Sequence, residues 1–322
     1  MIIPKYWAEA KTKTKFEGRQ YTIKRFGWSD QSIEAAHIHA EQRVTAAIEQ
    51  IKVDQNIRRI DHKVAYNGAE GLPIREEIVA QHDHVIITRN TYGALCLNTP
   101  DVLFADIDFI YHPNSKLYMT VFFLLLVISS LCAVYFSSWL IFGLGFVVSL
   151  LLTPWISKCL FKLKSKLRGT PEQQALEKIK TFSQHHPTWH LRVYRTPKGY
   201  RVLVMHQTFE PRGEDAQTLF HAIYADPHYD LMCRNQNCFR ARISPKPWRI
   251  GVERLRQGVW PVKDERLAQR ESWIRHYEQH ARHYASCRFI KQFGSQTIHE
   301  KAKRVQSLHD EYCKSSTQLD IA

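Results

Sequence analysis

The sequence predicts an α+β fold in which a ferredoxin-like βαββαβ core is interrupted by a transmembrane helical hairpin. An N-terminal α/β region precedes this core and a C-terminal helical region follows it. Three observations support the prediction. Residues 117–157 contain no charged side chain. Short runs on both sides of this stretch alternate apolar and polar residues, which is typical of half-buried strands. The length of 322 residues is enough for about two compact units.

The same features divide the chain into five segments. These are an N-terminal α/β region (1–83), the first core strands (84–116), the transmembrane hairpin (117–157), the rest of the core (158–251) and the C-terminal helical region (252–322).

Composition and charge narrow the class of protein. Charged residues make up 24% of the chain and hydrophobic residues 44%, which excludes a disordered tail protein, a collagen-like repeat and a disulfide miniprotein. Residues 1–116 carry 15 basic and 15 acidic side chains, whereas residues 158–322 carry 30 and 16, which accounts for the net charge of +14. The seven cysteines are scattered and form no Cys-x-x-Cys pair, which indicates a reducing compartment.

The N-terminal region is expected to contain one strand and two helices. Tyr21 and Ile23 indicate a strand that ends at Gly27, and Ser29 or Asp30 can cap the helix that follows. A short helix is expected at about 74–81. The first helix has an apolar stripe at the spacing of one helical face, made of Ile33, Ala36, Ala40, Val44, Ala47, Ile48 and Ile51.

Three strands are expected before the hairpin. They are His84–Thr88, Ala94–Leu97 and Val102–Phe109, and Asn90–Gly93 forms a turn between the first two.

The uncharged stretch is long enough for two spanning helices, at about 117–136 and 138–156, because one span needs about 20 apolar residues. Ser137 and Ser138 mark a tight turn between them, and Pro154 lies where the second helix should end. A buried soluble hairpin is the alternative, but neither helix has the polar face that a soluble helix needs.

Basic residues follow the second helix with no acid among them. Because basic loops stay in the cytoplasm, both termini are expected on the cytoplasmic side of a bacterial inner membrane. The start of the chain has no apolar core for a cleavable signal peptide. The basic run could also contact anionic lipid headgroups. It consists of Lys158, Lys162, Lys164, Lys166 and Arg168.

The second half continues the βαββαβ order. A helix opened by Pro171 is followed by strands at about 189–196 and 200–206, a helix at about 213–225 and a strand at about 238–243. Two long C-terminal helices are expected at about 264–293 and 297–313, with Gly294 as the stop of the first.

The strand Val102–Phe109 places Asp106 and Asp108 on one face, with their Cβ atoms about 6.5–7 Å apart. This spacing would let them share Mg²⁺ or Mn²⁺ ions, as two-metal phosphoryl-transfer sites require, and is equally compatible with two solvated acids. In the usual ferredoxin-like order the first strand, here Val102–Phe109, lies between the third and the fourth, at about 200–206 and 238–243. Arg201, Arg240 and Arg242 would then surround the two acids on the open face of the sheet. The five groups could hold a metal and phosphates, but a network of salt bridges is the favoured interpretation.

The segments FADID and TPKGYRVLV resemble the catalytic core of the archaeo-eukaryotic primase and primase-polymerase superfamily. The resemblance covers roughly residues 102–250. It implies that Asp106 and Asp108 are metal ligands for nucleotidyl transfer. It also implies a nucleotide-binding histidine where this chain has Arg201, which is a departure from the pattern. The candidates for a third acid are Glu210, Asp226, Asp230 and Glu253.

Other phrases of the sequence are similar to those of an uncharacterised family of bacterial two-pass membrane proteins, which implies no function. These phrases are KRFGWSDQS, TRNTYGALCLN and FRARISPKPWRIG.

Three further signals have competing interpretations. The seven basic residues of 234–256, with Phe239 and Trp248 among them, fit single-stranded nucleic acid, but contact with the membrane is favoured because the hairpin is near. His309-Asp310 is typical of metal-dependent phosphohydrolases, but a helix surface is favoured. His221 and His228 precede Cys233 and Cys238, but this spacing fits no common zinc site, so buried or unreactive thiols are favoured.

These observations predict an integral membrane protein that presents an anchored binding or scaffold module for an anionic partner on the cytoplasmic side. Besides the lipid bilayer, a nucleotide or a nucleic acid is the candidate partner. The alternative is a metal-dependent nucleotidyl or phosphoryl transfer enzyme that uses Mg²⁺ or Mn²⁺ at Asp106 and Asp108.

Overall fold

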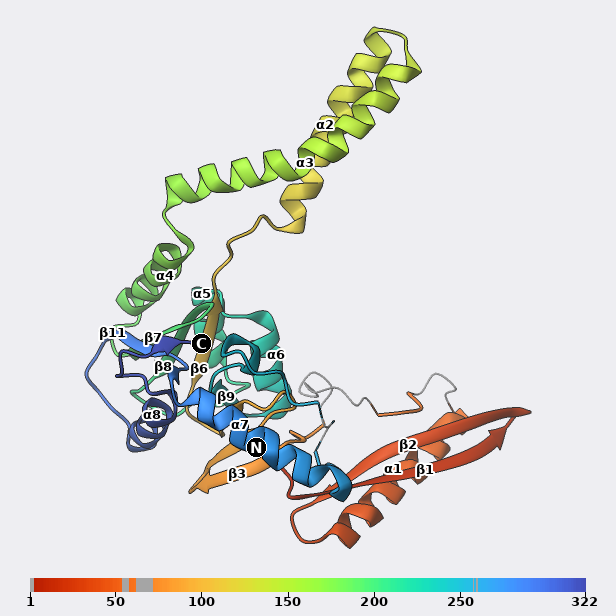
Figure 1. Ribbon diagram of the computed structural model, residues 1–322, viewed down its shortest axis with the longest axis vertical. Helices are drawn as coiled ribbons and strands as arrows, with labels where there is room; N and C mark the ends of the chain where they lie inside the picture. The colour runs from red at the N-terminus through yellow and green to blue at the C-terminus, as the bar shows by residue number, and fades with distance from the viewer. Residues whose placement is uncertain (1–2, 54–57, 62–71, 257, 259) are drawn as a thin grey trace.

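The computed structural model describes residues 3–53, 58–61, 72–256, 258 and 260–322. Within these residues the chain has a mixed α/β fold with eight α-helices and several antiparallel sheets. Figure 1 shows an α/β body from which a long helical hairpin projects at one end and an N-terminal unit at another.

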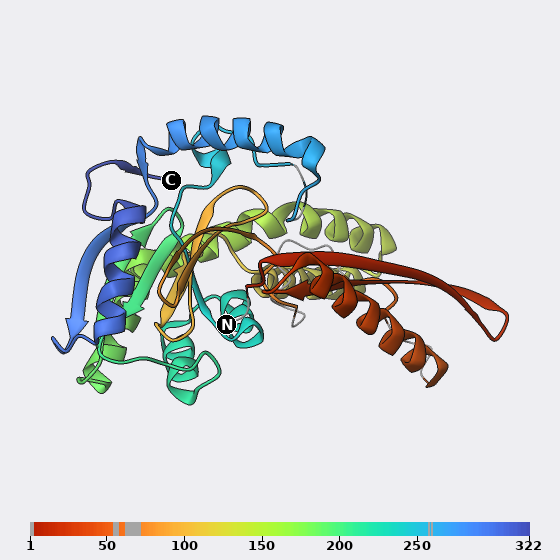
Figure 2. The same ribbon diagram turned by 90° about the horizontal axis from the view of Figure 1, so that it is seen from below.

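The N-terminal unit is a β-hairpin covered by one helix. Strands β1 (Tyr6–Phe16) and β2 (Arg19–Ser29) pair antiparallel, and α1 (Ile33–Val53) lies along them (Figure 2). The predicted apolar stripe of α1 is confirmed at five of its positions, which are buried: Ala36, Ala40, Val44, Ala47 and Ile51.

Two details of this unit differ from expectation. Strand β1 was not predicted, because most of its side chains face solvent and its sequence therefore lacks an apolar alternation. Ser32, rather than Ser29 or Asp30, caps α1, since its Oγ accepts a hydrogen bond from Ala35 N at 3.1 Å.

Gly27 is required by close packing, because a Cβ there would lie 2.1 Å from the carbonyl oxygen of Ala36 in α1.

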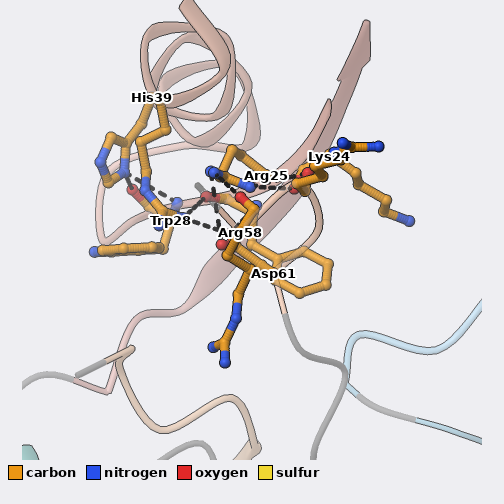
Figure 3. Close-up of polar contacts among 9 residues, drawn as sticks. Lys24, Arg25, Trp28, His39, Arg58 and Asp61 are labelled. Atoms are coloured by element: carbon orange, nitrogen blue, oxygen red, sulfur yellow. Dashed lines mark hydrogen bonds and ion pairs between the residues drawn. The ribbon is translucent and has the colours of Figure 1, made fainter. Parts of the chain in front are cut away.

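A buried carboxylate fastens residues 58–61 to this unit (Figure 3). Asp61 accepts hydrogen bonds from Phe26 N at 2.9 Å and from Arg43 Nη1 at 2.8 Å. Arg25 lies 3.7 Å from the same carboxylate and donates to the carbonyl oxygen of Arg59 at 3.1 Å. Desolvation by burial lowers the pKa of Arg25. Arg25 and Arg43 thus offset the cost of burying the Asp61 carboxylate away from water.

The body contains two four-stranded sheets. One has the order β3-β4-β5-β9 and the other the order β11-β7-β8-β6, and every hydrogen-bonded pair in them is antiparallel. The strands of the first sheet are β3 (Glu77–His82), β4 (Val85–Arg89), β5 (Leu95–Thr99) and β9 (Phe239–Arg242). Those of the second are β6 (Phe104–Asp108), β7 (His190–Thr196), β8 (Gly199–Val204) and β11 (Arg288–Gly294).

The predicted helix at 74–81 is wrong, because the segment is strand β3 paired with β4. Its glutamate, alanine and glutamine favour a helix locally, and tertiary pairing overrides that preference. The predicted turn between β4 and β5 is confirmed. The side-chain oxygen of Asn90 accepts hydrogen bonds from Tyr92 N at 3.2 Å and Ala94 N at 3.0 Å.

The expected position of β9 is wrong. It was expected beside β6, but it pairs with β5, with Ala241 opposite Leu97. The free edge of β6 is instead contacted by Asp226, whose backbone N–H donates to the carbonyl oxygen of Asp106 at 2.9 Å. Strands β6, β8 and β7 do lie in the expected order, but the four core strands do not form one hydrogen-bonded sheet.

Helices cover both faces of the second sheet. Helix α4 (Pro171–His185) and α5 (Glu214–Ile223) contribute buried side chains to its main core. Helix α8 (Glu300–Cys313) covers the face that was expected to be open (Figure 2). Consequently the side chains of Phe104, Tyr194 and Arg201 on that face are buried. Helix α6 (Pro227–Gln236), which was not predicted separately, follows α5.

The predicted helix at 264–293 is too long. Helix α7 ends earlier (Leu267–Ala281), and the residues after it form β10 (Tyr284–Ala285) and β11. Strand β11 pairs with β7 at the edge of the second sheet, and β10 pairs with β12 (Asp320–Ile321). Phe289 and Phe293 are four residues apart, and aromatic residues favour a strand. Gly294, with φ of 80°, ends this strand and not the predicted helix.

Two helices are long and apolar enough to cross a membrane by length and composition. Helix α2 (Ser115–Tyr135) and α3 (Trp139–Arg168) lie side by side and are joined by the expected tight turn at Ser137 and Ser138 (Figure 1). Helix α3 continues past Pro154, where it was expected to end, because the leucines and lysines that follow favour a helix. Figure 1 shows α3 turning away from the hairpin before it reaches α4.

The two helices of the hairpin pack through small residues. Ser149, Thr153 and Ser157 are buried at four-residue intervals along α3, and Gly145 continues the same row. A Cβ at Gly145 would lie 1.9 Å from Ser129 Oγ of α2. Large apolar side chains face outward instead; Leu131, Trp139 and Leu151, for example, are exposed. This distribution of small and large residues is typical of helices that pack within lipid.

Candidate functional site

An ion pair between a buried arginine and a half-buried carboxylate lies where the sequence predicted two acids among three arginines. Asp106 of β6 is directly opposite Arg201 of β8. Arg201 Nε and Nη2 donate to the two carboxylate oxygens of Asp106 at 2.8 and 3.1 Å, and its Nη1 donates to the carbonyl oxygen of Arg242 at 2.8 Å. Burial alone would lower the pKa of Arg201, but the Asp106 carboxylate outweighs it and raises this pKa. Arg201 therefore holds β6, β8 and β9 together.

A second predicted arginine is also paired. Arg240 of β9 donates to the carboxylate of Glu76, which is buried and accepts a further hydrogen bond from Thr88 Oγ1 at 2.7 Å. Two of the three arginines that were predicted to bind anions are thus neutralised inside the protein.

Asp106, Arg240 and Arg242 share one pocket of about 100 Å³. The pocket lies between the two sheets, since it takes residues from β5, β6 and β9. Its other lining residues are Glu76, Asn90, Thr91, Tyr92, Cys96, Tyr229 and Met232.

The third arginine belongs to a group of four cations that we call the basic cluster: Lys198, Arg242, Lys246 and Arg249. Lys198 lies in the turn between β7 and β8, and Arg242 ends β9. Lys246 precedes a 3₁₀ turn (Pro247–Arg249), and Arg249 is its last residue. Burial lowers the pKa of Lys246 to about 8, and repulsion from the other three members contributes. Arg249 Nη1 is buried without a hydrogen-bond partner among the described residues. The positive charge of the cluster therefore exceeds the negative charge around it.

Asp108 lies at the edge of the basic cluster. Although its side chain is exposed at the surface, its pKa is raised first by partial desolvation and then by Asp226 and Asp106, while Lys198 and Lys246 oppose the shift. Of the four candidates for a third acid, Asp226 is therefore the one near the strand acids. Asp230 pairs with Arg234, Glu253 pairs with Arg256, and Glu210 is exposed.

The arrangement of these acids does not fit the Mg²⁺ or Mn²⁺ site that the primase resemblance implies. Both oxygens of Asp106 are engaged by Arg201, so they are not free to bind a cation. Among the described residues, only Cys287, His309 and Cys313 place three possible metal-ligand atoms within 4.8 Å of one another.

The other histidines and cysteines considered as metal ligands differ in where they lie. Cys233 and Cys238 are buried while His221 and His228 are exposed, so the four do not gather into a metal site within the described part of the chain. The placement of His309 on a helix surface is wrong. The face of α8 that carries it packs on β7 and β8, and its ring lies 4.7 Å from that of Tyr194.

The five basic residues that follow the apolar stretch all lie on helix α3. All five side chains are exposed on the last turns of α3, beyond the uncharged part of the hairpin: Lys158, Lys162, Lys164, Lys166 and Arg168.

Lys246 and Arg249 belong to the basic residues of 234–256 for which membrane contact was favoured, and Lys198 had no predicted role. The signal that could have found the two lysines is their position directly after a proline, in TPKGY and SPKPW, because such turns hold a side chain at a strand end. Their convergence depends on how β9 is placed.

No protein-family model matches the chain, and no curated protein and no solved structure matches it.

Proposed function

We propose that this chain is an integral membrane protein whose α/β body binds an anionic partner at the basic cluster, on the cytoplasmic side of a bacterial inner membrane. Helices α2 and α3 form the two-pass anchor. The 21 residues of α2 span about 31 Å, close to the hydrocarbon thickness of about 30 Å. The exposed basic end of α3 lies at the lipid headgroups and keeps both termini on the cytoplasmic side.

In this proposal the hairpin is an insertion into a ferredoxin-like unit, between its first strand and its first helix. The order of β6, β8 and β7 and the connections through α4 and α5 support this assignment. Strand β9 is the fourth strand of the unit, displaced to pair with β5.

The observation that carries the binding function is the uncompensated charge of the basic cluster. Four cations repel one another, one arginine nitrogen is buried without a partner in the described structure, and Asp108 is the acid beside them. A phosphate group would relieve this repulsion through charge-assisted hydrogen bonds. Trp248, which is exposed and whose ring lies 5.2 Å from that of Tyr92, offers an aromatic surface next to the cations for the base of a nucleotide or nucleic acid.

Binding of an anion should depend on pH through Lys246. The pKa of Lys246 is about 8 in the protein without a bound anion. Because a bound anion favours the protonated ammonium, the affinity for the anion should fall as pH rises from 7 to 9. The Lys246→Met variant should bind about ten-fold or more weakly at pH 7, because it loses one charge-assisted contact. Its affinity should also change less between pH 7 and 9. Titration calorimetry of the detergent-solubilised chain with ATP and with a single-stranded oligonucleotide measures both effects.

Lys180→Met is the matched control, because Lys180 is an exposed lysine of α4 that pairs with Glu177, away from the cluster. It should bind as the wild type does at both pH values. Equal affinities of the wild type and Lys246→Met would contradict the proposal. Binding only to vesicles with anionic lipid would show that the cluster faces the membrane instead of a soluble partner.

The second candidate function is metal-dependent nucleotidyl or phosphoryl transfer, favoured by the proximity of Asp226 to Asp106 and Asp108. It requires Asp106 to leave Arg201. We therefore expect Mg²⁺ or Mn²⁺ to shift the Tm of the wild type and of Asp108→Asn equally, as measured by thermal unfolding in detergent. A shift that occurs in the wild type and disappears in Asp108→Asn would favour the enzyme.

A further inference from the structure

Two elements of the C-terminal region bring three metal-ligand side chains together in the core. Cys287 lies between β10 and β11, and His309 and Cys313 lie on α8. All three side chains are 0% exposed. Cys287 Sγ, Cys313 Sγ and one ring nitrogen of His309 all lie within 4.8 Å of one another.

The backbone fixes this convergence. His309 and Cys313 are four residues apart and therefore project from one face of α8. The backbone N–H of Ser286 donates to the carbonyl oxygen of Cys313 at 3.0 Å, which places Cys287 beside the last turn of the helix. Two of the ligands are thus placed by a helix, and the third by a short buried connection that is hydrogen-bonded to the end of that helix.

The separations suit a tetrahedral zinc ion. Zn–S and Zn–N bonds of about 2.3 and 2.05 Å at a tetrahedral angle put sulfur and nitrogen about 3.6 Å apart. The distance between Cys287 Sγ and His309 Nε2 is 3.8 Å. Only a small adjustment of side chains is needed to accept the ion.

A carboxylate orients the histidine for this role. His309 Nδ1 lies 3.1 Å from Asp310 Oδ1, so this nitrogen carries the proton and Nε2 presents its lone pair to the cysteines. Asp310 is itself held by Arg192 Nη2 at 3.2 Å and Gln306 Nε2 at 3.2 Å. Such a carboxylate–histidine pair is the usual second layer of a zinc site.

The Arg201 guanidinium lies next to the ligands. Its Nη1 lies 3.4 Å from His309 Nε2, which is a longer distance than the 2.8 Å to the carbonyl oxygen of Arg242. Arg201 therefore keeps its shorter hydrogen bonds when Nε2 binds a metal. Two thiolates would balance the charge of Zn²⁺, so the core gains no net charge.

We propose that Cys287, His309 and Cys313 bind one Zn²⁺ ion that fastens α8, which covers one face of the second sheet, to the start of the edge strand β11. The fourth position of the ion is left for a water molecule, since the group supplies three protein ligands. Binding releases the thiol protons of both cysteines to solvent. Asp310 is a positioning residue, because it acts on the metal only through His309. This site is independent of the basic cluster, so either proposal can fail alone.

Elemental analysis of the full chain, purified in detergent with reductant and supplied with Zn²⁺, tests this site. We expect about one zinc ion per chain in the wild type and a loss of most of it in Cys287→Ser and His309→Gln. Cys233→Ser is the matched control, because Cys233 is an equally buried free cysteine outside the group. It should keep its zinc. Less than about one zinc ion per ten wild-type chains, or equal zinc in Cys287→Ser and Cys233→Ser, would overturn the proposal.

Two further measurements keep the test decisive if a ligand variant fails to fold. The wild type loaded with Co²⁺ should show the thiolate-to-cobalt charge-transfer absorption, and its absence would count against thiolate ligands. Asp310→Asn keeps all three ligands and should weaken zinc affinity by about 10- to 100-fold in competition with a chromogenic chelator. Unchanged affinity would remove Asp310 from the site. A Cys287–Cys313 disulfide in peptide mass spectra of the chain purified in air without reductant, together with no zinc in the reduced chain, would replace the metal site by a redox pair.

Discussion

Replacing Arg201 by methionine is expected to lower the free energy of unfolding by about 2–3 kcal/mol, because its charge-assisted hydrogen bonds are lost. The Asp106 carboxylate left behind has 33% of its side chain exposed, so water replaces only part of them. The Arg201 side chain is 3% exposed. Its loss leaves the Asp106 carboxylate without its two hydrogen bonds and the carbonyl oxygen of Arg242 without a donor. Urea unfolding of the detergent-solubilised chain, followed by tryptophan fluorescence, measures the difference.

Arg234→Met is the matched control for this variant. Arg234 also makes two hydrogen bonds to one carboxylate, that of Asp230, but its side chain is 45% exposed. Its replacement should cost less than about 1 kcal/mol, because solvent screens a surface pair. The double variant Asp106→Leu/Arg201→Met should regain much of the lost stability, since it leaves no charge unpaired. Similar losses for Arg201→Met and Arg234→Met would show that burial does not set the strength of the pair.

Replacing residues 115–168 by a flexible Gly/Ser linker is expected to move the chain from the membrane pellet to the supernatant after alkaline carbonate extraction. The replaced segment contains both apolar helices, α2 and α3. Insertion of about 20 apolar residues per helix holds a protein in the bilayer under conditions that remove peripheral proteins. Immunoblots of pellet and supernatant measure the partition.

A second variant separates insertion from electrostatic attachment. It changes to glutamine only the five basic residues at the end of α3: Lys158, Lys162, Lys164, Lys166 and Arg168. This variant should stay in the pellet, because its apolar helices are intact, although its orientation signal is weakened. Release of the glutamine variant would show that these charges, and not the apolar helices, attach the chain to the membrane. Retention of the linker variant would show that residues outside 115–168 attach it.

The elements that the sequence predicts well are those whose signal is local. The uncharged stretch, the turn at Ser137 and Ser138 and the stripe of α1 are each read from neighbours along the chain. The alternation around Asp106 also predicts its face of the strand, and the pairing of β6 with β8 places Arg201 opposite it. Which strand pairs with the free edge of β6 depends on residues far away in the sequence, and no local pattern indicates it. The prediction for β9 therefore relied on a standard sheet order and was wrong.

The sequence by itself determined that this chain carries two helices suited to a membrane, a basic second half, and an acid-bearing strand after which the apolar stretch begins. The tertiary structure alone decided that β9 joins β5, that α8 closes the supposed open face, and that Cys287 meets His309 and Cys313. The physical reason is the range of the interactions. Periodicity records how a residue faces within its own helix or strand, whereas pairing of strands and burial of helices depend on residues far apart in the chain.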